Sequence, residues 1–525
     1  MTAASISFTG RLTIGGSTLT ATLTPAGSNG LLVFDGTAGQ QVSLGIGQGI
    51  VQGGVGINHP NGSSVAGVGI DYLGGDIHVA ALPVTGTYTI VVDPTGSYTG
   101  NLPLTLSQDL QLGTIAANGS AVAVSLTRPG QRARGTFSGT SGQRLSLHVH
   151  GVTVSANVVV LAPNGSTVTS LFLGQTTTLE LGPLAATGTY TILVDPERAN
   201  TGALSLTLSQ EVTDTITIDG ASKTVTTGLG QRARVTFAGT AGQRLSLGLT
   251  AISNGLSNLS LSQPDGTQLG STTGVWQFNG NTDIDYPLLP ATGTYTILVD
   301  PQGDYAGSMT LTLSSEITGA ITPGGSAVAL SFSRPGQRAR LTFSGTAGQR
   351  VSLKGTGINF WGHTESLVTP AGVSGGEFFN AWGTSGGNAF GGPLTLATTG
   401  TYAVLADPWS AATGNMTLTL YDVPADVTGS LTINGAVVPI ALTGPGQKAV
   451  FTFNATGGQA FTVRGNNSTM SCVTILLQSP AGGSSSGPCG NWTMGQTPGS
   501  NTTYTVTIDP EGANTGSVDL SVTAP

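Results

Sequence analysis

The chain has 525 residues, of which only 8% are Asp, Glu, Lys or Arg, against about 25% in an ordinary globular protein. Glycine contributes 81 residues, the hydrophobic share is 38% and the net charge is −8. This composition excludes a long charged helical protein, and the negative charge argues against a nucleic-acid-binding surface. The hydrophobic share favours a folded chain over a disordered one.

Neither a membrane span nor a secretory signal is predicted. No apolar run approaches the ~20 residues needed to cross a bilayer. The first eight residues, MTAASISF, have neither a basic n-region nor an apolar h-region. We therefore expect either a cytoplasmic protein or a fragment of a longer exported chain, or one whose start lies internally.

One unit of about 105 residues recurs five times along the chain. A PGQRARxTFSGTAGQRxSL-like segment is followed in each copy by a TGTYTILVDP-like segment, although the first copy is degenerate. The aspartates of the second segment lie 102, 105, 107 and 102 residues apart. This period fits a whole domain, because solenoid units are about 20 to 50 residues long. We predict five domains, with the boundaries 1–109, 110–212, 213–316, 317–424 and 425–525.

Alternating polarity and turn residues predict short strands in every copy. In the segment 132–137, RARGTF, small and apolar residues alternate with polar ones, which is typical of a half-buried strand. Turn sequences such as Pro163-Asn164-Gly165 lie in the middle of each copy. The predicted fold is all-β: five tandem antiparallel β-sandwich domains, of jelly-roll or Greek-key type, in an elongated array. Joined end to end, they would form a rod of roughly 150–200 Å.

A tyrosine opens the late TYTILVDP-like strand of each copy. A tyrosine two residues after glycine at this point is typical of a tyrosine corner, in which the hydroxyl bonds to upstream backbone. A tyrosine that contacts a ligand is the alternative. We predict the structural role for Tyr88, Tyr190, Tyr295, Tyr402 and Tyr504.

With these motifs in view, the chain resembles tandem bacterial pre-peptidase C-terminal (PPC)-like β-sandwich repeats, as found beside RHS/YD-repeat regions of surface proteins. The resemblance rests on LPxTGTYTILVDP, on PGQRARxTFSGTAGQRxSL and on the PxG turn between them, and it covers essentially the whole chain. It implies accessory modules without a catalytic set, and an extracellular setting.

Two recurring polar features are candidate sites. The aspartate of each Asp-Pro pair could ligate Ca²⁺, which takes six to eight oxygen ligands, or could form a turn at the strand end. These candidates are Asp93, Asp195, Asp300, Asp407 and Asp509. Arginines recur in threes, either as an anion-contact row or as partners of local carboxylates, at Arg132, Arg134 and Arg144, at Arg232, Arg234 and Arg244, and at Arg338, Arg340 and Arg350. The negative net charge favours local pairing.

Aromatic residues gather in the variable middle of the third and fourth copies. Aromatic faces on a β-sandwich are a usual platform for sugar rings, and core packing in a longer loop is the alternative. The candidates for glycan contact are Trp276, Trp361, Phe379 and Trp382.

The two cysteines, Cys472 and Cys489, flank a predicted turn in the last copy. A disulfide across this hairpin would stabilise the copy by about 3 kcal/mol in the chain-entropy model, and two buried free thiols are the alternative. A disulfide would indicate an oxidising compartment, in line with export.

These features predict a protein that is not an enzyme and needs no cofactor, apart from the calcium considered above. Matches to G-x-S-x-G lack the helix that a nucleophile elbow requires. We expect an extracellular or cell-surface structural or adhesion array, the stalk or spacer of a larger bacterial protein. Its partners would be neighbouring domains or extracellular glycans, not nucleic acid. A carbohydrate-binding array that uses the aromatics of the fourth copy is the rival prediction.

Overall fold

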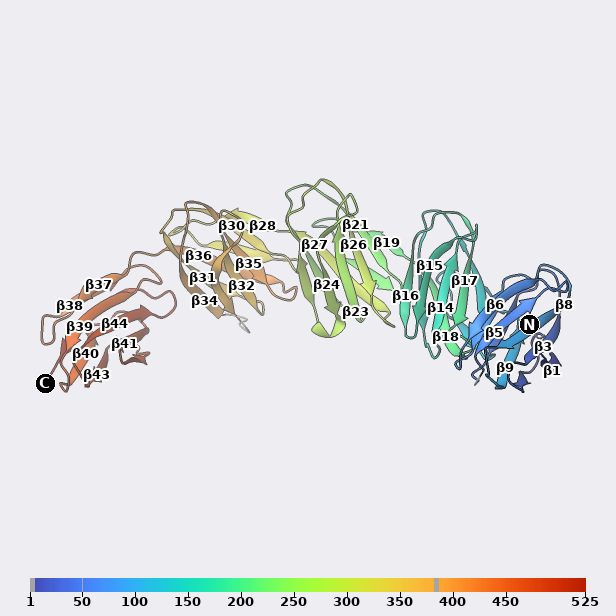
Figure 1. The fold of residues 1–525 in the computed structure, drawn as a ribbon. Helices are drawn as coiled ribbons and strands as arrows, with labels where there is room; N and C mark the ends of the chain where they lie inside the picture. Colours follow the sequence, from blue (N-terminus) through green and yellow to red (C-terminus); the bar gives the residue numbers. More distant parts are fainter. Residues whose placement is uncertain (1–4, 50, 382–386) are drawn as a thin grey trace.

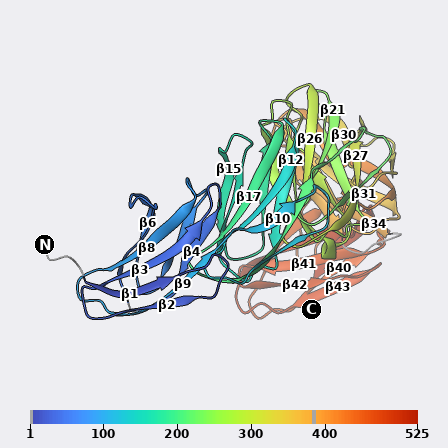
Figure 2. The same cartoon turned by 90° about the vertical axis from the view of Figure 1, so that its right-hand side faces the viewer.

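The computed structural model describes residues 5–49, 51–381 and 387–525. Its strands gather in five units that follow one another in a curved row, with the chain termini at opposite ends (Figure 1). Figure 2, turned by 90°, shows that the five units do not lie along one straight line. The array is therefore elongated but bent. The helix η1 (Gln277–Asn279) is a single turn, and no helix of the described residues could cross a membrane.

Within the described residues, each unit contributes nine strands. The first unit has β1 (Ile6–Arg11), β2 (Leu19–Leu23), β3 (Asn29–Gly36), β4 (Val42–Ile46), β5 (Gly53–Asn58), β6 (Ser64–Ile70), β7 (Gly75–Val79), β8 (Gly86–Pro94) and β9 (Gly100–Ser107). The second has β10 (Leu110–Thr114), β11 (Val122–Leu126), β12 (Ala133–Gly139), β13 (Arg144–His150), β14 (Ala156–Leu161), β15 (Thr167–Leu173), β16 (Thr177–Pro183), β17 (Gly188–Pro196) and β18 (Gly202–Gln210).

The remaining three units repeat this order. The third has β19 (Val212–Thr215), β20 (Lys223–Thr227), β21 (Ala233–Gly239), β22 (Leu245–Thr250), β23 (Leu256–Ser262), β24 (Gln268–Trp276), β25 (Thr282–Asp285), β26 (Gly293–Pro301) and β27 (Gly307–Ser315). The fourth has β28 (Ile317–Ala320), β29 (Val328–Phe332), β30 (Ala339–Gly345), β31 (Arg350–Ile358), β32 (His363–Val368), β33 (Ser374–Ala381), β34 (Gly387–Thr395), β35 (Gly400–Pro408) and β36 (Gly414–Asp422). The fifth has β37 (Val427–Ser430), β38 (Val438–Leu442), β39 (Ala449–Ala455), β40 (Phe461–Asn466), β41 (Val473–Ser479), β42 (Gly482–Ser486), β43 (Trp492–Gln496), β44 (Thr502–Pro510) and β45 (Gly516–Thr523).

In every unit the strands form a pair of sheets with constant topology. Numbered within a unit, the five-stranded sheet has the order 1-3-8-5-6 and the four-stranded sheet the order 2-9-4-7. The all-β class and the repetition are therefore confirmed. The prediction of purely antiparallel sheets is wrong, because the first strand runs parallel to the third, as β10 does to β12. The chain crosses to the other sheet for the second strand, so it returns in its original direction, which a hairpin cannot achieve.

One apolar cluster per unit lies between the two sheets. The period-2 pattern places alternate residues there: in β12, Ala133, Gly135 and Phe137 are buried and their neighbours less so. The ring of Phe137 stacks on that of Tyr190 on β17, with 5.1 Å between centroids. The same Phe–Tyr pair is stacked in the other four units, so each unit packs its own core around one aromatic pair.

Four of the five recurring tyrosines form the predicted corner. The hydroxyl of Tyr190 donates to the carbonyl oxygen of Ala186 at 2.7 Å and accepts a hydrogen bond from its N–H at 3.3 Å. The equivalent bonds join Tyr88 to Val84, Tyr295 to Ala291 and Tyr402 to Thr398. Within the described part of the chain, Tyr504 makes no such bond.

A difference in one small residue accompanies the missing corner. In the second unit, a Cβ on Gly139 would overlap Leu184 and the ring of Tyr190. In the fifth unit, the residue equivalent to Gly139 is Ala455, which pairs with Thr502. A methyl group therefore stands at the position that is glycine beside the tyrosine ring in the other four units.

The corner makes a testable prediction about stability. Replacing Tyr190 by Phe should destabilise the second unit by about 1 kcal/mol, because the N–H and carbonyl groups of Ala186 lose the hydroxyl of a buried tyrosine as their hydrogen-bond partner. The change should be smaller for Tyr504→Phe, which removes no corner bond. Hydrogen exchange of the strands of each unit, followed by mass spectrometry, measures both; equal losses of protection would contradict the prediction.

Candidate functional site

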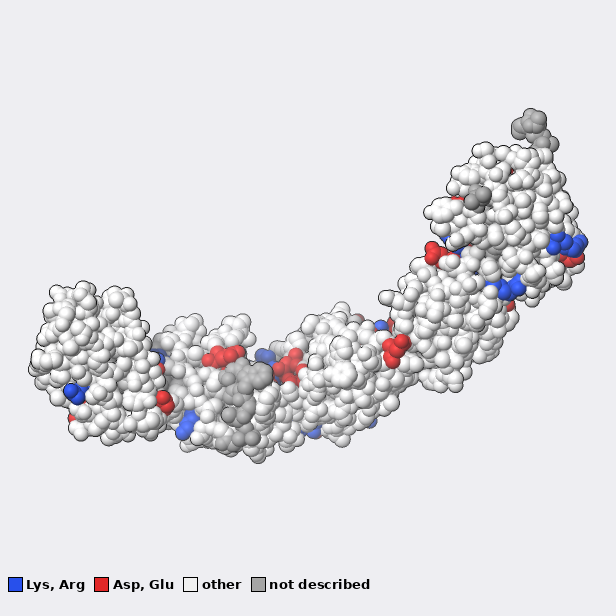
Figure 3. All heavy atoms as spheres, turned by 90° about the horizontal axis from the view of Figure 1, so that it is seen from below, with Lys and Arg blue, Asp and Glu red and all other residues white. Residues whose placement is uncertain are grey.

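Charged side chains gather where neighbouring units meet, and the rest of the face shown in Figure 3 is largely uncharged. An acidic residue stands just before the first strand of each later unit and pairs with basic residues of the array. Arg132 and Arg134 both lie 3.3 Å from Asp109, and Arg234 lies 2.7 Å from Glu211. The four acidic residues are Asp109, Glu211, Glu316 and Asp426. The junctions therefore hold the recurring polar chemistry of the molecule.

A turn of each later unit packs on an inner strand of the preceding four-stranded sheet. At the first junction, Gly130 of the turn lies against Gly45 of β4. A Cβ on Gly45 would overlap the carbonyl group of Pro129, and one on Gly130 would overlap the backbone of Gly45. Gly248 and the turn before β30 repeat this contact at the third junction. Glycine is required there because backbone meets backbone directly.

At the same two junctions, an arginine before the turn reaches back over the preceding unit. The Nε of Arg334 donates to Ser314 at 2.8 Å, and its Nη2 donates to the carbonyl oxygens of Gly220 at 2.7 Å and Leu313 at 3.1 Å. Arg128 forms the corresponding bond from Nε to Ser107 at 2.8 Å. These charge-assisted bonds to fixed backbone hold the docked turn in place.

At the second junction, Arg232 bridges carboxylates of two units. Its Nε lies 3.1 Å from Glu180 on β16 and 2.9 Å from Asp300 on β26. Beside it, the Nε2 of buried His148 lies 2.8 Å from Asp304, which again crosses the junction. Burial raises the pKa of Glu180 to about 7, because desolvation outweighs the favourable charge of Arg232.

The third junction concentrates acidic groups. Asp283 and Asp285 on β25 and Asp407 on β35 bring their carboxylate oxygens within 4.8 Å of one another. Arg338 lies 2.6 Å from Asp285 and 2.8 Å from Glu316. Burial, followed by repulsion from the two other aspartates, raises the pKa of Asp407 to about 8. Burial and then Asp285 raise the pKa of Asp283 to about 6. Such a group could hold a cation or shared protons.

The five aspartates considered for calcium therefore have different surroundings. Asp300 pairs with Arg232, and Asp509 lies 2.7 Å from Lys448. Asp407 joins the acidic group, whereas Asp195 lies 2.8 Å from His78 of the first unit. Asp93 forms no ion pair among the described residues. Each stands next to last in its strand, but they do not share one set of ligands.

The arginine trios contact local carboxylates, as the net charge favours. Seven of their nine members form ion pairs at junctions, and the other two are Arg144 and Arg244, which form none within the described residues. Arg350, for example, lies 2.8 Å from Asp426 in the connection to the fifth unit. The arginine trios therefore do not form an anion-contact row.

The four aromatic candidates do not form one platform. Phe379 packs against the core of the fourth unit and the ring of His363. Trp361 is 53% exposed, and its ring lies edge-on to Trp409 at 6.4 Å. Trp276 is exposed in the third unit beside exposed Phe278, with 6.1 Å between ring centroids. Trp382 lies outside the described residues.

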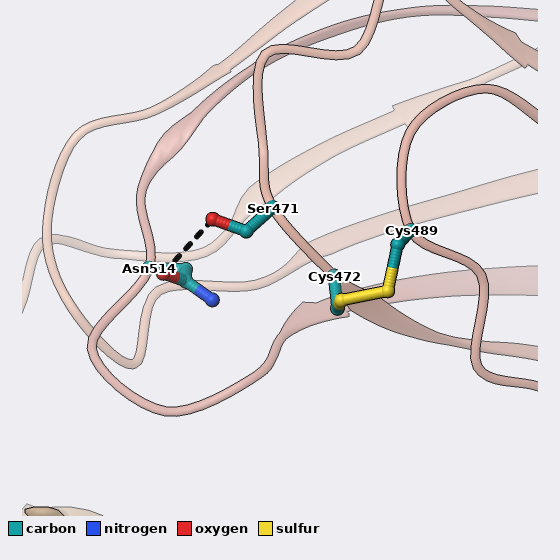
Figure 4. The surroundings of a disulfide bond; sticks show 4 residues. All are labelled: Ser471, Cys472, Cys489 and Asn514. Carbon is teal, nitrogen blue, oxygen red and sulfur yellow. Dashed lines mark hydrogen bonds between the residues drawn. A yellow bond between two sulfur atoms is a disulfide. The ribbon is translucent and has the colours of Figure 1, made fainter.

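A disulfide joins Cys472 and Cys489 in the fifth unit (Figure 4). Cys472 directly precedes β41 and Cys489 follows β42, and these strands pair antiparallel with Ile475 opposite Ser486. Continuing that register places the two cysteines opposite each other, which explains the bond. Ser471, beside Cys472, donates a hydrogen bond to Asn514 at 3.4 Å.

Sequence reasoning missed the acidic residues of the connections. They recur 21 to 23 residues upstream of the first basic residue of the Arg-Ala-Arg segment or its equivalent. That spacing was a usable signal, but the residues lie outside the motifs that define the repeat. It also missed Asp76, His78 and Glu180, because these vary from unit to unit.

No family model and no curated protein matches the chain. Among solved structures, it is similar to the pre-peptidase C-terminal domain of a collagenase from Bacillus anthracis, with 10% identity and a TM-score of 0.16 over 20% of this chain and 95% of that one. It is also similar to PliG, a periplasmic inhibitor of g-type lysozyme from Aeromonas hydrophila, with 20% identity and a TM-score of 0.15 over 20% and 98%. SGBP-B of a Bacteroides ovatus mixed-linkage glucan utilization locus, solved with a mixed-linkage heptasaccharide, has 14% identity and a TM-score of 0.11 over 79% and 95%. Scores far below 0.5 carry no functional argument.

The docked turns predict that Gly248→Ala loosens the third junction by about 1–3 kcal/mol, because the added Cβ must displace backbone of the fourth unit. Limited proteolysis of the connection around Glu316 should accelerate, while the units stay folded. Gly274→Ala is the matched control, since a Cβ there meets no atom closer than 3.8 Å. Equal cleavage rates in both variants would contradict the prediction.

The raised pKa of Glu180 predicts a pH dependence of stability. Between about pH 4.5 and 7 this carboxyl stays protonated in the folded state but ionises in the unfolded state, so its contribution falls as the pH rises. Glu180→Gln should therefore change stability little at pH 5 and raise it by roughly 1 kcal/mol at pH 8, after allowance for solvent screening. Denaturant titrations at both pH values, with exposed Glu197→Gln as control, measure this; a pH-independent difference would refute it.

Proposed function

We propose that the chain is a non-catalytic extracellular structural array, a stalk or spacer that presents a neighbouring module of a larger bacterial secreted or surface protein. In this proposal its five units, 1–109, 110–212, 213–316, 317–424 and 425–525, are β-sandwich domains of the PPC-like kind. Its partners are the adjoining domains of that larger protein.

The observation that carries the proposal is the docking of each unit on the next. Backbone contact at Gly45 and Gly248, together with ion pairs such as Asp71–Arg198 and Arg350–Asp426, leaves little freedom at the joints. The result is a long row with the termini at opposite ends (Figure 1). A row of this kind separates what is attached to its two ends, which is the work of a spacer.

Two further features support an extracellular, non-catalytic role. The disulfide of the fifth unit suits an oxidising compartment. Two of the G-x-S-x-G serines, Ser374 and Ser485, lie within strands β33 and β42, not on the strand-to-helix turn that exposes a nucleophile.

A carbohydrate-binding array is the second candidate. It is favoured by the exposed pair Trp276 and Phe278 in the third unit and by exposed Trp361 in the fourth, since aromatic faces stack on sugar rings. One molecule could have both functions, but only a carbohydrate-binding array would bind a soluble glycan.

Small-angle scattering and a glycan-array screen test the proposal together. A spacer should have a radius of gyration well above the ~24 Å of a compact globule of this length, and it should bind no glycan saturably. Saturable binding that is lost in Trp276→Ala or Trp361→Ala and kept in Phe379→Leu would instead support the carbohydrate-binding array. A compact radius of gyration would refute the spacer.

A further inference from the structure

Three side chains with metal-ligating atoms meet at the first junction. Asp76 and His78 come from β7 of the first unit, and Asp195 comes from β17 of the second. One oxygen of each carboxylate and the Nε2 of His78 lie within 4.8 Å of one another. His78 Nε2 is 2.8 Å from Asp195 and in still closer contact with Asp76. A histidine and two carboxylates from two units thus point at one place.

The hydrogen bonds around His78 fix which ring nitrogen faces that place. Ser43, its partner on β4, donates its hydroxyl hydrogen to Asp109 at 3.4 Å. The hydroxyl oxygen therefore accepts from His78 Nδ1, 3.0 Å away. With Nδ1 as the donor to Ser43, Nε2 is the ring nitrogen that faces the two aspartates. A metal-ligating histidine is commonly oriented by such a hydrogen bond from its other ring nitrogen.

The convergent atoms need a positive charge between them. His78 Nε2 and Asp195 Oδ1 are both buried and lack a hydrogen bond of ordinary geometry. In a neutral imidazole, a lone pair opposite two carboxylates is repulsive. Arg132, a nearby cation, is engaged by both oxygens of Asp109 at 3.3 Å. Either a proton or a metal ion must therefore occupy the space.

The other junctions show what occupies this place in the same fold. At the second junction, Glu180 stands at the position equivalent to His78. Glu180 lies opposite Ser146 in its sheet, and His78 lies opposite Ser43 in the first unit. There the guanidinium of Arg232 sits between Glu180 and the counterpart of Asp195. A cation thus bridges the two units at the second junction, whereas the first junction supplies a nitrogen and two oxygens in its place.

The donor set selects the class of cation. One imidazole nitrogen and two carboxylate oxygens suit Zn²⁺ and its neighbours in the transition series, whereas Ca²⁺ prefers six to eight oxygens. At metal–ligand distances of about 2.0–2.2 Å, tetrahedral ligands lie roughly 3.3 Å apart. The 2.8 Å contact between His78 and Asp195 and the closer contact between His78 and Asp76 would both widen to admit the ion. Three protein ligands would leave one position for water.

We propose that Asp76, His78 and Asp195 bind a Zn²⁺-type divalent cation that joins the first and second units. The ion would take the bridging position that Arg232 holds at the second junction. It would also fix the angle of the first joint, because two of its ligands belong to one unit and the third to the next. This proposal does not depend on whether the array is a spacer or binds glycans.

The test uses the full chain after treatment with chelator. Isothermal titration with Zn²⁺ should show a site for which excess Ca²⁺ or Mg²⁺ does not compete. His78→Gln and the isosteric Asp195→Asn should each weaken Zn²⁺ binding at least tenfold. His148→Gln is the matched control, because His148 also faces an aspartate across a junction but has one carboxylate there; it should bind Zn²⁺ like the wild type.

A second readout separates the proposal from an imidazolium salt bridge. Zn²⁺ should slow proteolysis of the connection around Asp109 in the wild type and not in Asp195→Asn, and circular dichroism should show that the variants are folded. X-ray absorption of the Zn²⁺ complex should report nitrogen and oxygen ligands. Absence of Zn²⁺ binding, or binding unchanged in both His78→Gln and Asp195→Asn, would overturn the proposal and leave a protonated histidine as the bridge.

Discussion

Direct contact between two backbone segments is the constraint on which the extended array depends. At the first and third junctions, a turn of one unit lies on an inner strand of the previous unit, and a side chain at Gly45 or Gly248 would separate them. The contact fixes the distance between units, so the ion pairs around it can form at normal lengths. Without it, residues such as Arg334 and Arg128 would not reach the preceding unit.

Around the docked turn, which every junction has, the polar residues differ from one junction to the next. The first has His78 between two aspartates, the second a bridging arginine, the third a group of aspartates, and the fourth a lysine paired with Asp509. The cores show the opposite behaviour, since the stacked Phe–Tyr pair is the same in every unit. The joints are thus the part of the array that can respond individually to pH or to a bound cation.

Features that depend on residues close together in the sequence can be predicted from it, and features that depend on distant residues cannot. Strands, turns, the corner at Tyr190 and the Cys472–Cys489 pair depend on residues close in sequence or on a repeated pattern, and the sequence indicates them. The parallel first strand was not foreseen, because its direction depends on a crossover to the second sheet. Pairs such as His78 with Asp195 join different units, so neither period nor spacing within one copy indicates them. The sequence pattern alone does not distinguish an exposed aromatic residue such as Trp361 from one packed against the core such as Phe379.

The disulfide gives the last unit a distinct mechanical property. If tension were applied to the ends of the array and the units unfolded one after another, four of them would release their full length. In the fifth, the segment between Cys472 and Cys489, separated by 17 residues, would stay closed as a loop. At about 3.4 Å per extended residue, that unit would lengthen by roughly 60 Å less than its size implies. One end of the array is therefore less extensible than the other.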